Sequence, residues 1–166
     1  GRIHDMMTEA QVDFVLTEHA FAPKLSSFPI RYTDCEICGV ETPSWKRNAI
    51  EDPERPAYVL YTSGTTNRPK GVPINNINEV LSAHDIMMHF PLGPTDRTMN
   101  MTPWFHRGGI HSGGPCPTLY AGGEVVILRD FAPKRCLEYA SKYNISFLIG
   151  VPTIIAMLAR TQERTP

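Results

Sequence analysis

The sequence predicts an α/β fold, with a mostly parallel sheet flanked by helices. Short apolar stretches of strand length alternate with stretches whose apolar residues recur every three or four positions. Prolines and an asparagine stand where several of these helices are expected to begin or end. Strands that alternate with helices form parallel β-α-β units, buried between layers of helices. Ligands then bind at the carboxyl ends of the strands, so the loops that leave the strands are the candidate sites.

Residues 1–56 are expected to form a lead-in segment. A helix is expected at Arg2–Ala10, and buried strands are expected at Asp13–Thr17 and Pro29–Thr33. Residues 34–56 contain several prolines among mixed charges, which is typical of a loop.

Residues 57–166 continue the alternation of strands and helices. Ala57–Tyr61 is an apolar strand that runs directly into a segment rich in glycine, serine and threonine. Asn76 and Glu79 have the three-residue spacing of a helix capping pair. The helix that follows is expected to carry on one side Ile77, Val80, Leu81, His84 and Met88.

Three more strands and three more helices are expected after that helix. In order they are a strand at Arg97–Thr102, an irregular helix at Gly109–Tyr120, a strand at Glu124–Leu128, a helix from Pro133 to Tyr143, a strand at Ser146–Ile149 and a helix from Pro152 to Arg160. Proline suits the first turn of a helix, and Asn144 suits the left-handed position at a helix end.

The composition excludes several classes of function. Hydrophobic residues make up 42% of the chain and charged residues 20%, as in globular domains. The net charge of -1 gives no basic field for nucleic acid or an anionic membrane. The longest apolar runs, Val125–Leu128 and Ile145–Val151, are far shorter than the roughly 18–20 residues that span a bilayer. No signal segment opens the chain, and a cytoplasmic location is expected.

The cysteines and histidines give only an incomplete metal pattern. The four cysteines are Cys35, Cys38, Cys116 and Cys136. Cys35 and Cys38 have C-x-x-C spacing, which is half of a zinc site or a redox pair, but no second half follows. His111 follows His106 by five positions, whereas helical metal ligands lie three or four apart. We therefore expect free thiols and no metal site.

The densest functional signal is the segment Tyr61–Val72, which reads YTSGTTNRPKGV. Gly64 and Gly71 let the backbone approach an anion closely, and the hydroxyls and loop amides can form an anion-binding concavity. Lys70 adds a point charge for phosphate oxygens. No hydroxyl residue follows Gly71, so the segment is not a Walker loop. An ordinary polar turn is the alternative, but so many hydroxyls favour anion binding.

This loop resembles the ATP loop of the adenylate-forming superfamily, which comprises acyl- and aryl-CoA ligases, amino-acid-adenylating domains and luciferases. The usual form is T/S-S-G-T-T-G-x-P-K-G, and this chain departs from it at Asn67, a residue that tolerates positive φ. The resemblance implies that residues 1–166 are a partial AMP-binding domain, part of the large N-terminal domain without the C-terminal one. Residues 57–166 would carry the ATP loop and the acyl pocket.

The resemblance also assigns the phosphate-binding residues. They are Thr62, Ser63, Gly64, Thr65, Thr66 and Lys70. These groups would stabilise the leaving pyrophosphate when a carboxylate attacks the α-phosphorus of ATP, with Mg²⁺ assisting. Coenzyme A would be the co-substrate that accepts the acyl group.

Pro103–Ser112 leaves a strand and enters a glycine-rich helix start. It resembles the second family motif, P-x-F-H-x-x-G, whose aromatic–histidine pair borders the carboxylate substrate. By this resemblance His106 is the gate of the acyl pocket, and Gly108 and Ser112 face the acyl group. Arg129 follows a predicted strand, near where CoA ligases place a basic residue for the CoA phosphates; a solvated arginine is the alternative.

We therefore expect a fragment of an ATP-dependent carboxylic-acid:CoA ligase that uses ATP, CoA and a small carboxylic acid. The alternatives are an amino-acid-adenylating domain and a non-catalytic nucleotide-binding fragment. Amino-acid-adenylating domains usually carry aspartate at the position of His106, where it pairs with the substrate's α-ammonium. The histidine suits an aryl or alkyl acid instead, because a buried ammonium needs a carboxylate partner.

No ribose-binding, acidic or C-terminal lysine motif of the family is found in this segment, so the isolated chain is expected to be inactive. It is also expected to expose apolar surface through which copies could associate.

Overall fold

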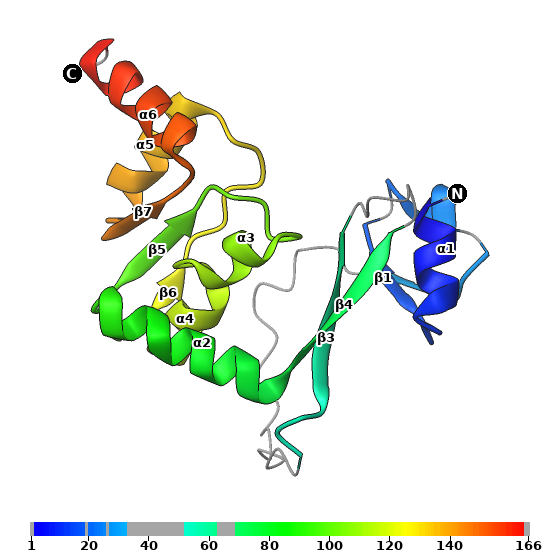
Figure 1. Ribbon diagram of the computed structural model, residues 1–166. Helices are drawn as coiled ribbons and strands as arrows, with labels where there is room; N and C mark the ends of the chain where they lie inside the picture. Colours follow the sequence, from blue (N-terminus) through cyan, green and yellow to red (C-terminus); the bar gives the residue numbers. More distant parts are fainter. Residues whose placement is uncertain (1, 19, 26, 33–51, 63–68, 165–166) are drawn as a thin grey trace. The chain divides into compact units, whose positions relative to one another are not determined.

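The computed structural model describes residues 2–18, 20–25, 27–32, 52–62 and 69–164 (Figure 1). The helices are α1 (Arg2–Glu9), α2 (Asn76–His89), α3 (Arg107–His111), α4 (Pro115–Tyr120), α5 (Pro133–Lys142) and α6 (Pro152–Arg164). The strands are β1 (Val15–Thr17), β2 (Ile30–Tyr32), β3 (Pro56–Thr62), β4 (Lys70–Asn75), β5 (Arg97–Asn100), β6 (Glu124–Val125) and β7 (Phe147–Ile149), and a 3₁₀ turn covers Ala22–Leu25. Within the described residues, every helix is too short or too polar to cross a membrane.

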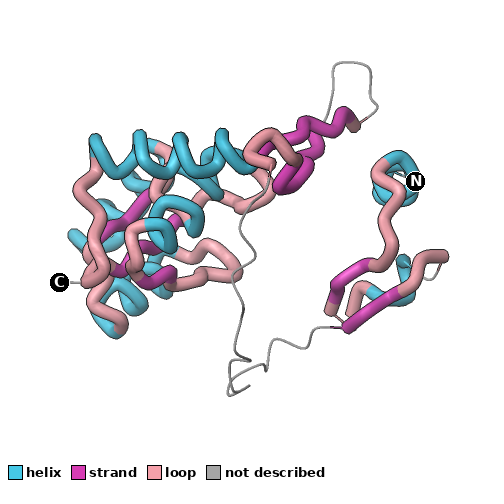
Figure 2. The backbone as a smooth tube through the Cα atoms, turned by 90° about the horizontal axis from the view of Figure 1, so that it is seen from below, coloured by secondary structure: helices cyan, strands magenta, loops and turns pink. Residues whose placement is uncertain are grey.

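The chain divides into two compact units. The smaller unit contains the described residues of 1–51 and 61–71, and the larger unit contains those of 52–60 and 72–166. In the smaller unit β1 and β2 form a parallel pair in which Val15 lies opposite Ile30, and Figure 2 shows these two short strands side by side. The Tyr61 hydroxyl donates a hydrogen bond to the carbonyl of Met6 on α1, at 3.2 Å.

The core of the larger unit is the parallel sheet β6-β5-β7. Thr98 on the central strand lies opposite Val125 on β6 and opposite Phe147 on β7. These parallel pairs confirm the expected α/β class, while β3 and β4 form a separate two-stranded sheet. The central strand β5 has a neighbour on each edge, and its residues Thr98 and Met99 are completely buried.

Side chains of successive strand residues point to opposite faces of a sheet, and β5 uses both of its faces. Met99 packs with Met101, with Cys136 of α5 and with Leu158 of α6 in the hydrophobic core. On the other face, the hydroxyl of Thr98 lies 2.8 Å from the hydroxyl of Thr118 on α4. Helices α5 and α6 therefore cover one face of the sheet and α4 covers the other, which gives three layers.

Several expected helix boundaries are confirmed. Pro133 and Pro152 are the first residues of α5 and α6. Asn144, just after α5, has the left-handed φ of 49°. The irregular helix expected at Gly109–Tyr120 is wrong in one respect, because the chain forms two short helices there. Pro115 opens the second of them, α4, since proline can start a helix but cannot continue one.

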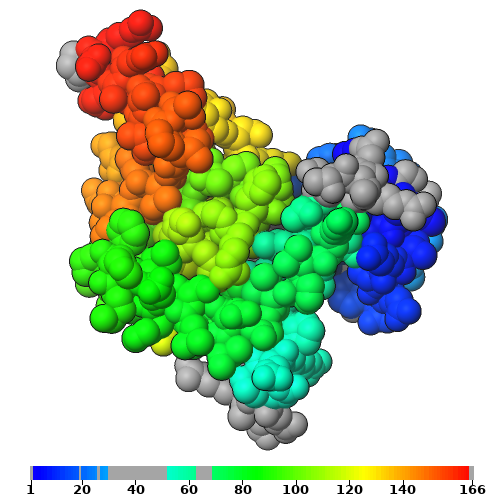
Figure 3. Space-filling model, in the orientation of Figure 1, coloured from blue at the N-terminus to red at the C-terminus, as the bar shows by residue number. Residues whose placement is uncertain are grey.

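Two expectations about α2 are corrected. Its N-cap is Asn75, whose side chain accepts a hydrogen bond from the backbone of Asn78 at 2.9 Å, so Asn76 and Glu79 are not a capping pair. The side that carries the predicted apolar residues is exposed, and Figure 3 shows the green side chains of this helix at the surface. Met88, for example, is 73% exposed, whereas the buried residue of this helix is Ala83.

The strands also differ from the predicted ones in length and in burial. The strand expected at Glu124–Leu128 ends at Val125, although the backbone of Val126 still donates a hydrogen bond to the carbonyl of Thr98 at 2.8 Å. Burial on both faces is true of β5, but Leu16 of β1 is 61% exposed and Val59 of β3 is 43% exposed. Among the described residues, β1 and β3 each pair with one neighbouring strand, whereas β5 pairs with two.

Gly109→Ala is expected to destabilise the chain by about 1–3 kcal/mol, because a Cβ atom at Gly109 would lie 2.1 Å from the carbonyl oxygen of Pro103. Chemical denaturation monitored by circular dichroism would measure the loss. Gly108→Ala is the matched control, since a Cβ there meets no atom within 4 Å. Its free energy of unfolding should stay within about 1 kcal/mol of the parent, and equal losses in both variants would contradict this packing account.

Candidate functional site

A cavity of about 410 Å³ opens at the carboxyl ends of β5 and β6. It is lined by Asn100, Met101, Thr102, Pro103, Trp104, Phe105, Ile127, Leu128, Arg129 and Phe131. These residues come from the end of β5 and from the two loops that leave β5 and β6, which is where parallel sheets bind ligands. Aromatic and aliphatic walls with a guanidinium at one edge suit a ligand that has an apolar body and an anionic group.

Arg129 lines the same cavity as Trp104 and Phe105, the aromatic residues of the second motif. This arrangement follows from the early end of β6, because Ile127–Arg129 leave the sheet and turn toward Trp104 and Phe105. The position of Arg129 agrees with a role at an anionic ligand. Its role toward CoA stays a prediction.

The three residues assigned to the acyl pocket lie along α3, beside this cavity rather than in its wall. His106 is the exposed N-cap of the helix, and its ring centroid lies 4.8 Å from that of Phe105. Gly108 is exposed in the first turn, and Ser112 is the C-cap. Ser112 lines a second, apolar cavity of about 230 Å³ together with Gly113 and residues of β7.

The phosphate loop is described only at its two ends. Thr62 is the exposed last residue of β3, and Lys70 is the exposed first residue of β4. Both side chains are therefore accessible. The other predicted phosphate ligands, Ser63, Gly64, Thr65 and Thr66, lie outside the described residues, as do Cys35 and Cys38.

Asn100 holds α3 at the end of β5. Its side-chain amide donates to the carbonyls of Gly108, at 3.3 Å, and Ser112, at 3.0 Å, while its side-chain oxygen accepts from the backbone of Thr102 at 2.8 Å. Asn100 is 5% exposed, so these are interior contacts. Sequence reasoning missed this residue, because an asparagine at the end of an expected strand carries no motif.

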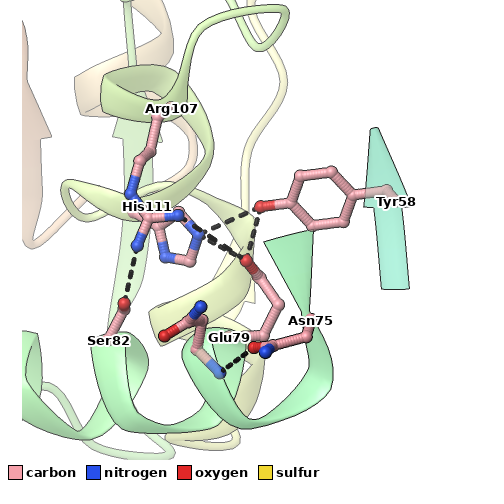
Figure 4. Close-up of polar contacts among 7 residues, drawn as sticks. Tyr58, Asn75, Glu79, Ser82, Arg107 and His111 are labelled. Carbon is pink, nitrogen blue, oxygen red and sulfur yellow. Dashed lines mark hydrogen bonds and ion pairs between the residues drawn. The ribbon is translucent and has the colours of Figure 1, made fainter. Parts of the chain in front are cut away.

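Glu79 of α2 is the centre of a second polar cluster, drawn in Figure 4. Its Oε1 atom accepts hydrogen bonds from the hydroxyl of Tyr58, at 2.5 Å, and from Nε2 of His111, at 2.7 Å. The thiol of Cys116 on α4 is a third donor. An Nη1 atom of Arg107 lies 4.0 Å from the same oxygen, with the Glu79 side chain 15% exposed.

The cluster shifts the pKa values of its members. Burial raises the pKa of Glu79, but the hydrogen bonds from Tyr58, Cys116 and His111 outweigh burial and hold the pKa below its usual value. Burial, and then the hydrogen bond to Glu79, raises the pKa of Tyr58 well above its usual range. Burial and the same carboxylate raise the pKa of Cys116 to about 12. Glu79 is therefore held as a carboxylate by protonated neighbours.

His111 carries its proton on Nε2 in this arrangement, because that nitrogen faces the carboxylate. Its Nδ1 atom is buried and has no hydrogen-bond partner among the described residues. No motif singles out His111, since its five-residue spacing from His106 matches no ligand pattern. Only the structure distinguishes His111, because it shows a histidine that is 4% exposed and hydrogen-bonded to the carboxylate of Glu79.

Glu79, His111 and Cys116 are also a group of residue types that could hold a metal ion, with ligand atoms within 4.8 Å of one another. A tetrahedral zinc ion bound at about 2.0–2.1 Å keeps its nitrogen and oxygen ligands roughly 3.3 Å apart. The separation of 2.7 Å between His111 Nε2 and Glu79 Oε1 is instead that of a hydrogen bond. The geometry favours a hydrogen-bonded cluster.

Comparisons with known proteins identify the family. The family described as AMP-binding enzyme matches residues 1–166. The chain is 35% identical to the sulfoacetate–CoA ligase of Cupriavidus necator, over 64% of this chain and 21% of the relative. It is 36% identical to the oxalate–CoA ligase of Saccharomyces cerevisiae, over 66% of this chain and 20% of the relative. The chain thus spans about a fifth of the length of these relatives.

A solved structure with the same fold is that of the o-succinylbenzoate coenzyme A synthetase from Bacillus subtilis, in complex with ATP and a magnesium ion. The TM-score is 0.76 at 22% sequence identity, and the match covers 96% of this chain and 33% of that one.

Cys116 should react slowly with iodoacetamide at pH 8, because a thiol with a pKa of about 12 is almost entirely protonated there. Glu79→Gln removes the negative charge and should increase the alkylation rate of Cys116 roughly tenfold. Peptide mass spectrometry resolves each cysteine. Cys136 is the internal control, since burial alone raises its pKa. A parallel increase at Cys136 would indicate general unfolding and contradict the assigned cause.

Zinc should not copurify with the chain or remain bound after dialysis, because the cluster already satisfies Glu79 with hydrogen bonds. Elemental analysis of the wild type and of Cys116→Ser measures the metal content. One zinc ion per wild-type chain that is lost in Cys116→Ser would overturn the hydrogen-bonded interpretation.

Proposed function

Since this chain belongs to the family of AMP-binding enzymes, we propose that it is part of an ATP-dependent carboxylic-acid:CoA ligase. The observation that carries the proposal is the phosphate loop, Thr62–Lys70, which keeps all but one position of the family pattern. Two relatives at 35% and 36% identity are named as CoA ligases, which supports CoA as the acceptor. ATP and Mg²⁺ in the related synthetase structure support MgATP as the first substrate.

In the first proposed step, a carboxylate oxygen of the acid attacks the α-phosphorus of ATP. The bond from that phosphorus to the oxygen that bridges to the β-phosphate breaks, and pyrophosphate leaves. Thr62, Ser63, Gly64, Thr65, Thr66 and Lys70 are proposed to hold the β- and γ-phosphates. Lys70 supplies a positive charge where negative charge develops, and its side chain is exposed at the start of β4.

In the second step, the CoA thiolate attacks the carbonyl carbon of the acyl-adenylate, and AMP leaves with the electron pair of the broken C–O bond. His106 is proposed as the gate between the acid and the thiol, with Gly108 and Ser112 along the acyl side. The cavity beside Trp104 and Arg129 supports this arrangement, because it offers aromatic walls and a cation together. Arg129 is proposed to meet a CoA phosphate.

The acid is proposed to lack an α-amino group. An amino acid brings an ammonium that needs a carboxylate partner when it is buried. The position after Phe105 holds His106 instead of an acidic residue, and the described cavity wall contains a cation at Arg129. Both features favour carboxylic acids whose remaining part is apolar or negatively charged over amino acids, which carry an ammonium group.

Lys70→Ala should lower the rate of ATP–pyrophosphate exchange about 10²- to 10³-fold in the full-length enzyme that contains this segment, because it removes one charge-stabilising donor. The assay uses a panel of aryl, alkyl and dicarboxylic acids, and formation of acyl-CoA is followed by mass spectrometry. Lys134→Ala on α5 is the control, with unchanged exchange expected.

Exchange with amino acids but with no simple carboxylic acid would replace the CoA-ligase proposal by an amino-acid-adenylating domain. ATP binding without exchange for any acid would indicate a non-catalytic nucleotide-binding protein. The isolated chain should show no ligase activity, so acyl-CoA formation by residues 1–166 alone would contradict the proposal that it is one part of the enzyme.

A further inference from the structure

Helix α3 is poorly equipped to hold its own position. It has five residues, two of which are the adjacent glycines Gly108 and Gly109. A single turn of helix is unstable by itself, and glycine weakens it further. Its N-cap, His106, makes no side-chain capping hydrogen bond. The position of the helix therefore depends on contacts from other elements.

Those contacts come from two directions. Asn100 binds the carbonyls of Gly108 and Ser112 from the end of β5. On the other side, residues of α2 bind the side chains of Arg107 and His111, which point from α3 toward α2 (Figure 4). Glu79 accepts from His111 at 2.7 Å, and the hydroxyl of Ser82 accepts from Nη2 of Arg107 at 2.7 Å.

Arg107 and His111 are four residues apart, so they lie on the same side of α3. One oxygen of Glu79 faces both of them, at 4.0 Å from Arg107 and 2.7 Å from His111. Tyr58 of β3 donates to the same oxygen at 2.5 Å and lies 3.1 Å from His111 Nε2. The Glu79 carboxylate thus binds the last residue of this short helix, His111, and lies within ion-pair distance of its first residue, Arg107.

We propose that Glu79 is a positioning residue for the acyl side of the site, acting through Arg107 and His111 on the helix that begins at His106. The inference rests on the proposed function, and it adds a residue that touches no substrate. Loss of the carboxylate removes the His111 contact with α2 and leaves α3 held by the Arg107–Ser82 hydrogen bond and by Asn100. His106 and Ser112, at the two ends of α3, then lose their fixed places.

The first measurement is local and does not depend on activity. Hydrogen–deuterium exchange of the chain should show that Glu79→Gln exposes the amides of Gly109, Ile110 and Ser112, which bond within α3. Their exchange should become at least roughly tenfold faster, while the amides of α5 keep their protection. Asp85→Asn is the matched control, because it makes the same chemical change on an exposed residue of α2.

The second measurement uses the full-length enzyme that contains this segment. Glu79→Gln should lower kcat/KM for the carboxylic acid about 10- to 100-fold, while the KM for ATP changes less than about twofold. His111→Gln keeps an N–H donor near the place of Nε2 and should retain most activity, whereas His111→Leu should behave like Glu79→Gln. A merely structural role would not give this difference between the two His111 variants.

Three results would overturn the proposal. They are unchanged exchange of the α3 amides in Glu79→Gln, equal deprotection of α3 and α5, and equal loss of kcat/KM for the acid and for ATP. If the wild-type enzyme shows no exchange with any carboxylic acid, the proposed function fails. The amide-exchange result still decides whether Glu79 positions α3.

Discussion

Strand β5 is hydrogen-bonded to a parallel neighbour on each edge, and this double pairing constrains the larger unit. The strand cannot shift without breaking two ladders at once. A slip of one residue would exchange the faces of Thr98 and Met99. The hydroxyl of Thr98 would then lose Thr118 and enter the apolar layer that contains Cys136 and Leu158. The pairing of β5 therefore fixes which helices cover which face.

The candidate site inherits its geometry from this strand. Asn100, the last residue of β5, binds both the backbone of Thr102 and the carbonyls of Gly108 and Ser112. Gly109 permits the approach of α3 to Pro103, where a side chain would collide with the carbonyl. The aromatic segment between these points is left to face the loop after β6, where Arg129 stands. The buried amide of Asn100 and the lack of a side chain at Gly109 thus hold α3 next to the segment that lines the cavity.

The sequence was sufficient for the class of fold and for most element positions, because apolar periodicity and prolines act locally. Pro133 and Asn144 mark the two ends of α5 through their own backbone preferences. The sequence was insufficient where tertiary contacts determine the length of a strand or the buried side of a helix. Val125 ends β6 although apolar residues continue, and α2 leaves Met88 exposed while it buries Ala83. The phosphate loop could be recognised from its motif, whereas the residues that hold α3 could not.

Glu79 illustrates why the residues that hold α3 cannot be found from sequence motifs. A carboxylate in the first turn of a helix is usually explained by the helix dipole, which favours negative charge there. Here the same residue is largely buried, and burial disfavours its charge. The charge survives because three donors from β3, α3 and α4 converge on it. No pairwise spacing in the sequence encodes that convergence, since Tyr58 and His111 are separated by 53 positions. An anion that needs several elements to satisfy it also orders those elements, and this makes Glu79 a residue through which the acyl side of the site can be positioned.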